Sequence, residues 1–135
     1  MKFSYGEKAI FSDLNLELVS GERIAIMGPS GSGKTTLLHL AAGLLRPQCG
    51  LIARSPHDSV AMVFQEDRLI PQLTALKNVS FTAPLESDTV IHSLLGQVGL
   101  MDVADCFPSQ LSGGMKRRSA VVRAIASRSD YLLLD

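Results

Sequence analysis

The feature that most constrains this chain is a glycine-rich stretch at residues 28–35, Gly-Pro-Ser-Gly-Ser-Gly-Lys-Thr. It fits the pattern G-x-x-x-x-G-K-[ST] at every fixed position. An apolar run rich in branched side chains precedes it at residues 23–27 and predicts a buried parallel strand. Apolar residues at helical spacing follow over residues 36–45, among good helix formers. A strand, a glycine loop and a helix in this order predict a site for the phosphates of a nucleoside triphosphate.

The residue types in this loop suit that chemistry. Gly28, Gly31 and Gly33 lack a Cβ, so the backbone can curl and come close to a ligand. The loop's N–H groups would then face the anion, aided by the positive end of the following helix. Lys34 is expected to reach the β- and γ-phosphates, and the Thr35 hydroxyl to ligate Mg²⁺. A plain Gly/Ser-rich turn is the alternative, but such a turn does not require every fixed position.

Composition limits the class of protein. The 135 residues are enough for one domain with a core and too few for two. A net charge of zero gives no electrostatic argument for binding nucleic acid. No apolar run approaches the length that spans a bilayer, and the N-terminus lacks a signal-peptide layout. Cys49 and Cys106 are too few for a disulfide framework and lack metal-site spacing. These features favour the cytosol.

Strands are expected on both sides of the glycine loop. Loose alternation at residues 3–5 and 14–19 indicates half-exposed antiparallel strands, and residues 51–54 indicate a short strand. Residues 60–64 predict a second buried strand that ends at Gln65. Open α/β sheets place ligand-contacting groups just past the carboxyl ends of their strands. Gln65 is therefore a candidate contact for Mg²⁺ or an attacking water, although an exposed loop glutamine fits its position equally well.

The second half of the chain changes character. Residues 66–109 indicate a small, mostly helical insert. Another helix is expected to begin after Ser112 and to run to about Ser127. Ser112 is a good N-cap, and Gly113 and Gly114 expose backbone N–H groups at the positive end of this helix. This arrangement predicts a second anion site, with a plain helix cap as the alternative.

Two more candidates rest on weaker patterns. The apolar run at residues 131–134 is expected to be a buried strand, and Asp135 follows it. Apolar residues followed by Asp are the Walker B pattern, whose carboxylate helps to hold Mg²⁺. Tyr5 offers a ring that stacks on a base, but its spacing alone favours an ordinary strand tyrosine.

These motifs together resemble the ATP-binding subunit of ABC transporters, and the resemblance covers the whole chain. Residues 28–35 match the family's Walker A motif, Gln65 lies at its Q-loop, and residues 132–135 match the start of Walker B. Residues 111–115 match the LSGGQ signature, with Met115 in place of the usual Gln. The signature is the most specific of these matches, because other P-loop families lack LSGG ahead of Walker B.

The resemblance implies an α/β fold. A P-loop NTPase core of the RecA-like type would carry an N-terminal antiparallel β subdomain and a helical subdomain with the signature. Residues 1–65 and 129–135 would form the nucleotide-binding core, and about 66–128 the helical subdomain. In the family the catalytic Glu, the D-loop and the switch His follow the position of Asp135. The chain is therefore expected to be a single incomplete domain, truncated at Walker B, that binds ATP but hydrolyses it poorly.

The resemblance also assigns ligands. Adenine would stack on the ring at the A-loop, and the phosphates would lie in the Walker A loop. The implied ATP-binding residues are Tyr5, Gly28, Pro29, Ser30, Gly31, Ser32, Gly33, Lys34, Thr35 and Thr36. Mg²⁺ would be held by Thr35, Gln65 and Asp135. Lys34 and Gln65 would be the catalytic residues that this chain contains.

The same resemblance implies partners. Two ATP-binding subunits would pair head to tail, with Ser112, Gly113 and Gly114 of one contacting the γ-phosphate bound by the other. The pair would drive transmembrane permease subunits from the cytoplasmic face of the membrane, with an extracytoplasmic substrate-binding protein as an indirect partner and no nucleic acid. Residues 63–79 and 107–118 look most like bacterial importers of nitrate/sulfonate/taurine type.

Two other functions stay open at this point. One is a nucleotide-dependent dimerisation module without useful hydrolysis, as expected of a chain that lacks the catalytic Glu. The other is a non-transport ABC protein of DNA repair or translation. Such proteins usually carry long coiled-coil insertions or tandem domains, and this compact, neutral chain has neither. The cargo of a transporter cannot be read from this chain.

Overall fold

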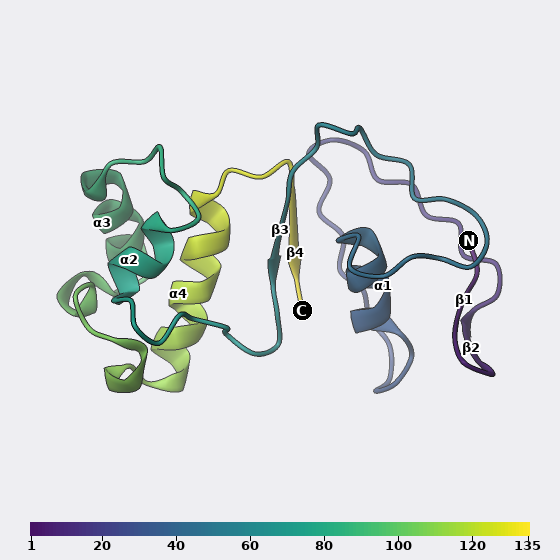
Figure 1. Cartoon of the computed structure of the whole chain (residues 1–135), viewed down its shortest axis with the longest axis horizontal. Coiled ribbons are helices and arrows are strands. Elements are labelled where there is room, and N and C mark those ends of the chain that lie inside the picture. The colour runs from purple at the N-terminus through teal and green to yellow at the C-terminus, as the bar shows by residue number, and fades with distance from the viewer. The chain divides into compact units, whose positions relative to one another are not determined.

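The computed structural model describes all 135 residues, which divide into two compact units (Figure 1). The first unit comprises Met1–His57 together with Asp135, and the second comprises Asp58–Leu134. The glycine loop belongs to the first unit, and the signature helix belongs to the second. None of the helices is long and apolar enough to cross a membrane.

The first unit contains a β-hairpin and one helix. Strands β1 (Phe3–Tyr5) and β2 (Lys8–Phe11) pair antiparallel. The alternation at residues 3–5 predicts β1, whereas β2 was not predicted. Helix α1 (Lys34–Ala41) follows the glycine loop, also as predicted, but it ends before residue 45. Gly43 stops it by adopting a left-handed φ of 76°, and the Leu44 N–H donates to the His39 carbonyl at 2.9 Å.

Three of the predicted strands in this unit are wrong. Residues 14–19, 23–27 and 51–54 form neither helix nor strand, and Met27 is 89% exposed rather than buried. A strand is maintained by hydrogen bonds to a neighbouring strand. The only sheets are β1 with β2 and β3 with β4, so these apolar runs have no partner. Branched side chains alone do not hold a strand in place.

The second unit contains a short parallel sheet. Strands β3 (Val60–Val63) and β4 (Tyr131–Leu134) pair in register, from Val60 opposite Tyr131 to Val63 opposite Leu134. Both strands were predicted. The prediction that residues 131–134 are buried is wrong, since Leu134 is 55% exposed. Helix α4 (Gly113–Ala126) packs on β3 through Val63.

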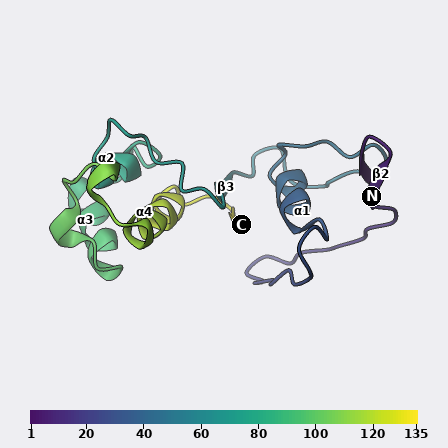
Figure 2. The ribbon, with the colours of Figure 1, turned by 90° about the horizontal axis from the view of Figure 1, so that it is seen from below.

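Three helices form the larger core of this unit, and Figures 1 and 2 show them grouped together. They are α2 (Ala75–Ser80), α3 (Asp88–Gln97) and α4 (Gly113–Ala126). Two short 3-10 turns, η1 (Met101–Val103) and η2 (Pro108–Gln110), connect α3 to α4. The buried side chains that hold the helices together include Leu76, Val79, Ile91, Leu95, Leu100 and Val122. The predicted helical insert is thus confirmed.

Candidate functional site

The glycine loop is closed by its own lysine. Lys34 is the first residue of α1, and its Nζ donates to the carbonyl of Gly28 at 2.9 Å and to that of Pro29 at 2.8 Å. The Ser32 N–H donates to the Pro29 carbonyl at 3.3 Å, which tightens the same bend. The ammonium group therefore lies at the mouth of the loop that it is predicted to serve, next to the start of the helix.

Gly33 is a residue of the loop at which only glycine fits. Its φ is 96°, a left-handed conformation that L side chains rarely adopt. A Cβ there would come within 2.6 Å of Ile10 Cγ2 and 3.0 Å of Phe11 Cζ. The loop is thus packed directly on β2, the strand that pairs with the one carrying Tyr5.

Thr35 and Asp135 meet in the first unit. The Thr35 hydroxyl donates to Oδ1 of Asp135 at 2.9 Å, so the Walker A and Walker B residues lie side by side. Hydroxyl and carboxylate oxygens are ligands that suit Mg²⁺. No group of three or more His, Cys, Asp or Glu side chains could hold a metal ion by itself. The donor set therefore fits a Mg²⁺ ion that shares its coordination with phosphate oxygens, as Mg²⁺ commonly does.

Tyr5 lies on the hairpin with much of its ring accessible. The side chain is 51% exposed, and its ring meets Phe3 edge-on, with centroids 5.0 Å apart. Phe3 is buried and holds one side of the tyrosine ring. An aromatic ring that is supported on one side and open on another is suited to stacking on a planar group.

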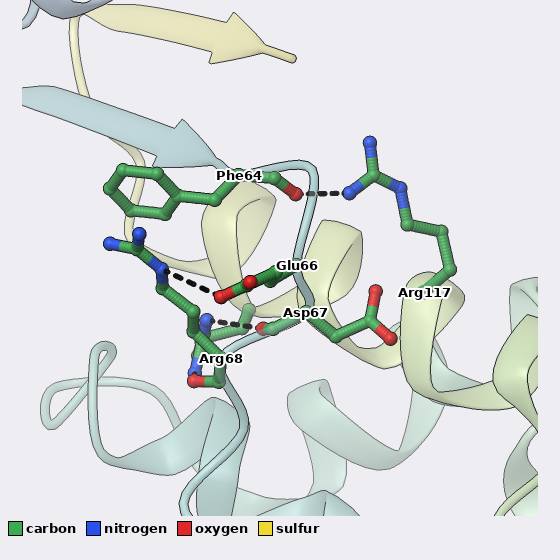
Figure 3. A network of polar contacts seen from close by, with 6 residues as sticks. Phe64, Glu66, Asp67, Arg68 and Arg117 are labelled. Carbon is green, nitrogen blue, oxygen red and sulfur yellow. Dashed lines mark hydrogen bonds and ion pairs between the residues drawn. The ribbon is translucent and has the colours of Figure 1, made fainter.

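Gln65 follows β3 in the second unit and is exposed. Arginines of α4 hold the backbone around it, and Figure 3 shows the contact between Arg117 and Phe64. Arg117 donates to the Phe64 carbonyl, and Arg123 donates to the carbonyls of Asp67 at 3.1 Å and Arg68 at 2.8 Å. The loop that carries Gln65 is thus fastened to the signature helix on both sides of this residue.

Sequence reasoning missed the two arginines. The basic run of residues 116–118 is typical of a solvent-exposed helix face, and no role was predicted for Arg123. The available signal was a charged residue among small apolar ones, in the run Ala120-Val121-Val122-Arg123-Ala124. A charge on a helix face that is otherwise packed needs a polar partner. Backbone carbonyls of the loop after β3 provide it.

The signature begins α4 in the way its sequence predicts. Ser112 is the N-cap, and its side chain accepts a hydrogen bond from the Met115 N–H at 3.3 Å. Gly113 and Gly114 are exposed, and a Cβ on Gly113 would meet nothing within 4 Å. The first turn of the helix is therefore open to a partner or an anion.

Comparison with known proteins decides the family. The family model described as "ABC transporter" matches residues 11–135, which is most of the chain. The chain belongs to the ABC transporter family. The resemblance inferred from the Walker A and signature motifs is thereby confirmed.

Curated relatives of this ABC transporter chain include importer subunits. It is 40% identical to the aliphatic sulfonates import ATP-binding protein SsuB 2 of Burkholderia cenocepacia, over 97% of this chain and 52% of that protein. It is 39% identical to SsuB 1 of Pseudomonas aeruginosa, over 98% of this chain and 58% of that protein. The chain thus spans little more than half the length of these relatives.

A solved structure confirms the fold class. It is the dimeric post-hydrolysis state of the ATP-binding cassette MJ0796 bound to ADP and Pi, with a TM-score of 0.83 and 31% sequence identity. The match covers 99% of this chain and 69% of that one. The chain therefore has the α/β fold of ABC ATPase domains.

Proposed function

We propose that this chain is the ATP-binding part of an ATPase subunit that powers an ABC importer. The observation that carries the proposal is the complete Walker A loop, with Lys34 bonded to the loop's first carbonyls. On ATP binding, Nζ of Lys34 would exchange these carbonyls for β- and γ-phosphate oxygens. The backbone N–H groups of residues 30–36 would bind the same phosphates, and adenine would stack on Tyr5.

Mg²⁺ would enter with the nucleotide. Thr35 and Asp135 would be its ligands, with Gln65 as a third, and the ion would neutralise charge on the β- and γ-phosphates. Lys34 would stabilise the charge that develops as the γ-phosphoryl group leaves. The Gln65 amide would orient the attacking water, a role in which geometry matters more than acidity.

A second ATP-binding subunit would complete the site. Ser112, Gly113 and Gly114 would contact the γ-phosphate bound by the partner, supported by the exposure of these residues and by the dimeric state of the related cassette. The further partners would be transmembrane permease subunits, which the two ATP-binding subunits would drive from the cytoplasmic face of the membrane. An extracytoplasmic substrate-binding protein would be an indirect partner. Two of the curated relatives are named aliphatic sulfonates import ATP-binding proteins, which favours an organic sulfonate as cargo.

Nucleotide titration tests the proposal. Charge-assisted hydrogen bonds contribute on the order of 1.5–3 kcal/mol each, so Lys34→Ala should weaken Mg-ATP binding at least about tenfold in calorimetry. Lys77→Ala, which removes an exposed lysine from α2, is the matched control and should bind like the parent. Equal affinity of the parent and Lys34→Ala would exclude the glycine loop as the phosphate site.

A further inference from the structure

Side chains from two helices bind the backbone of the loop after β3. From α4, the guanidinium groups of Arg117 and Arg123 reach the carbonyls of residues 64, 67 and 68. From α2, the fully buried Asn78 donates to the carbonyls of residues 70, 73 and 74 and accepts from the Ile70 N–H. The backbone of this loop is thus fastened along most of its length.

Gln65 lies between two of these contacts. Arg117 binds the carbonyl of the residue before it (Figure 3). Arg123 binds the carbonyls two and three residues after it. Arg117 and Arg123 are six residues apart on the same helix, so one rigid element sets both ends of the short segment around Gln65. The Gln65 side chain itself is exposed.

Arg123 is the stronger of the two anchors. Its guanidinium is half-buried and donates to two carbonyls from two different nitrogens, Nη1 to Arg68 and Nη2 to Asp67. Burial lowers the pKa of Arg123 and the charge of Asp67 raises it in part, yet an arginine stays charged throughout the neutral range. A planar fork that engages two acceptors fixes an angle as well as a distance.

The loop backbone at this point is held in an unusual conformation. Arg68 has a φ of 46°, which is uncommon for a residue with a side chain. Its guanidinium lies 3.8 Å from the ring centroid of Phe64, and its Nε is 4.0 Å from Glu66. A conformation of this kind persists where surrounding contacts enforce it. The two carbonyl contacts from Arg123 are such a restraint.

We propose that Arg123 is a positioning residue, which fixes the loop carrying Gln65 to the signature helix by binding the carbonyls of Asp67 and Arg68. Movement of α4 would thereby be passed to Gln65 through the backbone. The inference deepens the proposed function, since it rests on the role given there to Gln65. The attachment of the loop can be tested without nucleotide, and the effect on Gln65 with it.

Limited trypsin digestion tests the attachment. Trypsin cuts after Arg68 only if the local backbone can extend, so release of its carbonyl should expose this bond. We expect Arg123→Ala to accelerate cleavage after Arg68 at least tenfold relative to cleavage after Lys77 in α2. Cleavage at Lys77 reports on opening of the whole unit, which separates local release from unfolding. Arg123→Lys, which retains one charged donor, should restore part of the protection.

Arg118→Ala is the matched control for this measurement, because Arg118 is an exposed arginine of the same helix. It should leave the ratio of cleavage after Arg68 to cleavage after Lys77 unchanged. If Arg123→Ala and Arg118→Ala give the same ratio, or if Arg123→Ala raises both cleavages equally, Arg123 does not position the loop and the proposal fails.

Nucleotide titration tests the effect on Gln65. The measured quantity is the gain in ATP affinity that Mg²⁺ provides. Arg123→Ala should reduce this gain as much as Gln65→Ala does, and the double variant should lose no more than either alone, within about twofold. A normal Mg²⁺ gain in Arg123→Ala, or fully additive losses, would overturn the positioning role. Failure of the parent chain to bind ATP at all would instead refute the proposed function, while digestion would still decide whether Arg123 holds the loop.

Discussion

The Thr35 hydroxyl donates to the Asp135 carboxylate at 2.9 Å, although 100 residues separate the two in the chain. Thr35 is the second residue of α1, and Asp135 follows the last residue of β4. Their contact places a hydroxyl and a carboxylate oxygen together beside the glycine loop. Two oxygens of this kind are incomplete as a metal site, but they suit an ion whose other ligands are phosphates.

Replacing Thr35 tests this pairing. Thr35→Val keeps the shape of the side chain and removes the hydroxyl. We expect ATP affinity without Mg²⁺ to change little, and the gain that Mg²⁺ provides to fall by about tenfold, the loss of one charge-assisted contact. Thr35→Ser keeps the hydroxyl and is the control. If the valine variant binds Mg-ATP as well as the serine variant does, Thr35 is not a ligand of the ion.

Gly33→Ala tests the packing of the glycine loop on the hairpin. The new Cβ would meet Ile10 Cγ2 at 2.6 Å in a backbone conformation with φ of 96°. Left-handed strain costs on the order of 1–3 kcal/mol, and the steric overlap adds to it. Gly21→Ala has similar strain, with φ of 82°, but no neighbour within 4 Å. Thermal unfolding and ATP titration should show a larger loss for Gly33→Ala, and equal losses would mean that the overlap relaxes freely.

Gly113→Asp separates the two anion sites. A Cβ at position 113 would meet no atom within 4 Å, and an acidic residue in the first turn of α4 should stabilise the helix by about 0.3–1 kcal/mol. ATP binding by the monomer should therefore persist. ATP-dependent dimerisation, followed by analytical ultracentrifugation, should fail because the carboxylate meets the partner's γ-phosphate. Ser109→Asp adds the same charge to η2 and should leave the dimer intact, whereas loss of ATP binding in the Gly113→Asp monomer would contradict an intersubunit role.

Asn78→Ala should be among the most damaging single substitutions in the second unit. Asn78 is fully buried and makes four hydrogen bonds to the backbone of residues 70, 73 and 74. Buried groups left without partners cost about 1–3 kcal/mol each, so we expect a loss of roughly 2–5 kcal/mol in urea unfolding. Asn15→Ala, at an exposed residue, should change stability by less than about 0.5 kcal/mol. Similar urea midpoints for Asn78→Ala and Asn15→Ala would show that the backbone groups bound by Asn78 find other hydrogen-bond partners.

Asp130 predicts a loss of stability in acid. The pKa of Asp130 lies below the ordinary 3.8, mainly because its carboxylate accepts a hydrogen bond from the Ser59 backbone N–H. A hydrogen bond from the Ser59 hydroxyl lowers this pKa further. Because the folded pKa is the lower one, this contribution is fully present above pH 3.8 and is lost as the pH falls through the folded pKa. The urea midpoint of Asp130→Asn should therefore approach that of the parent in acid, while Asp102→Asn controls for loss of charge. A constant difference at all pH values would contradict this account.

Local chemistry let the sequence predict several features correctly. Helix α4 begins after Ser112 because a serine side chain caps the N–H of a residue three positions on, a contact within one turn. The strand at residues 3–5 and the paired strands at residues 60–63 and 131–134 also follow patterns contained in short runs. The Walker A motif specifies residue types whose role depends mainly on the loop itself.

Tertiary structure decided the rest. Residues 23–27 have the composition of a buried strand, but a strand needs a hydrogen-bonded neighbour, and none is paired with them. Arg123 reaches carbonyls that lie 55 and 56 residues away, and Thr35 reaches Asp135 across 100. No periodicity or motif encodes such contacts, because they depend on how packed elements bring distant backbone and side-chain atoms together. The sequence by itself predicted which residues would bind phosphate, and the tertiary structure decided which partners hold them in place.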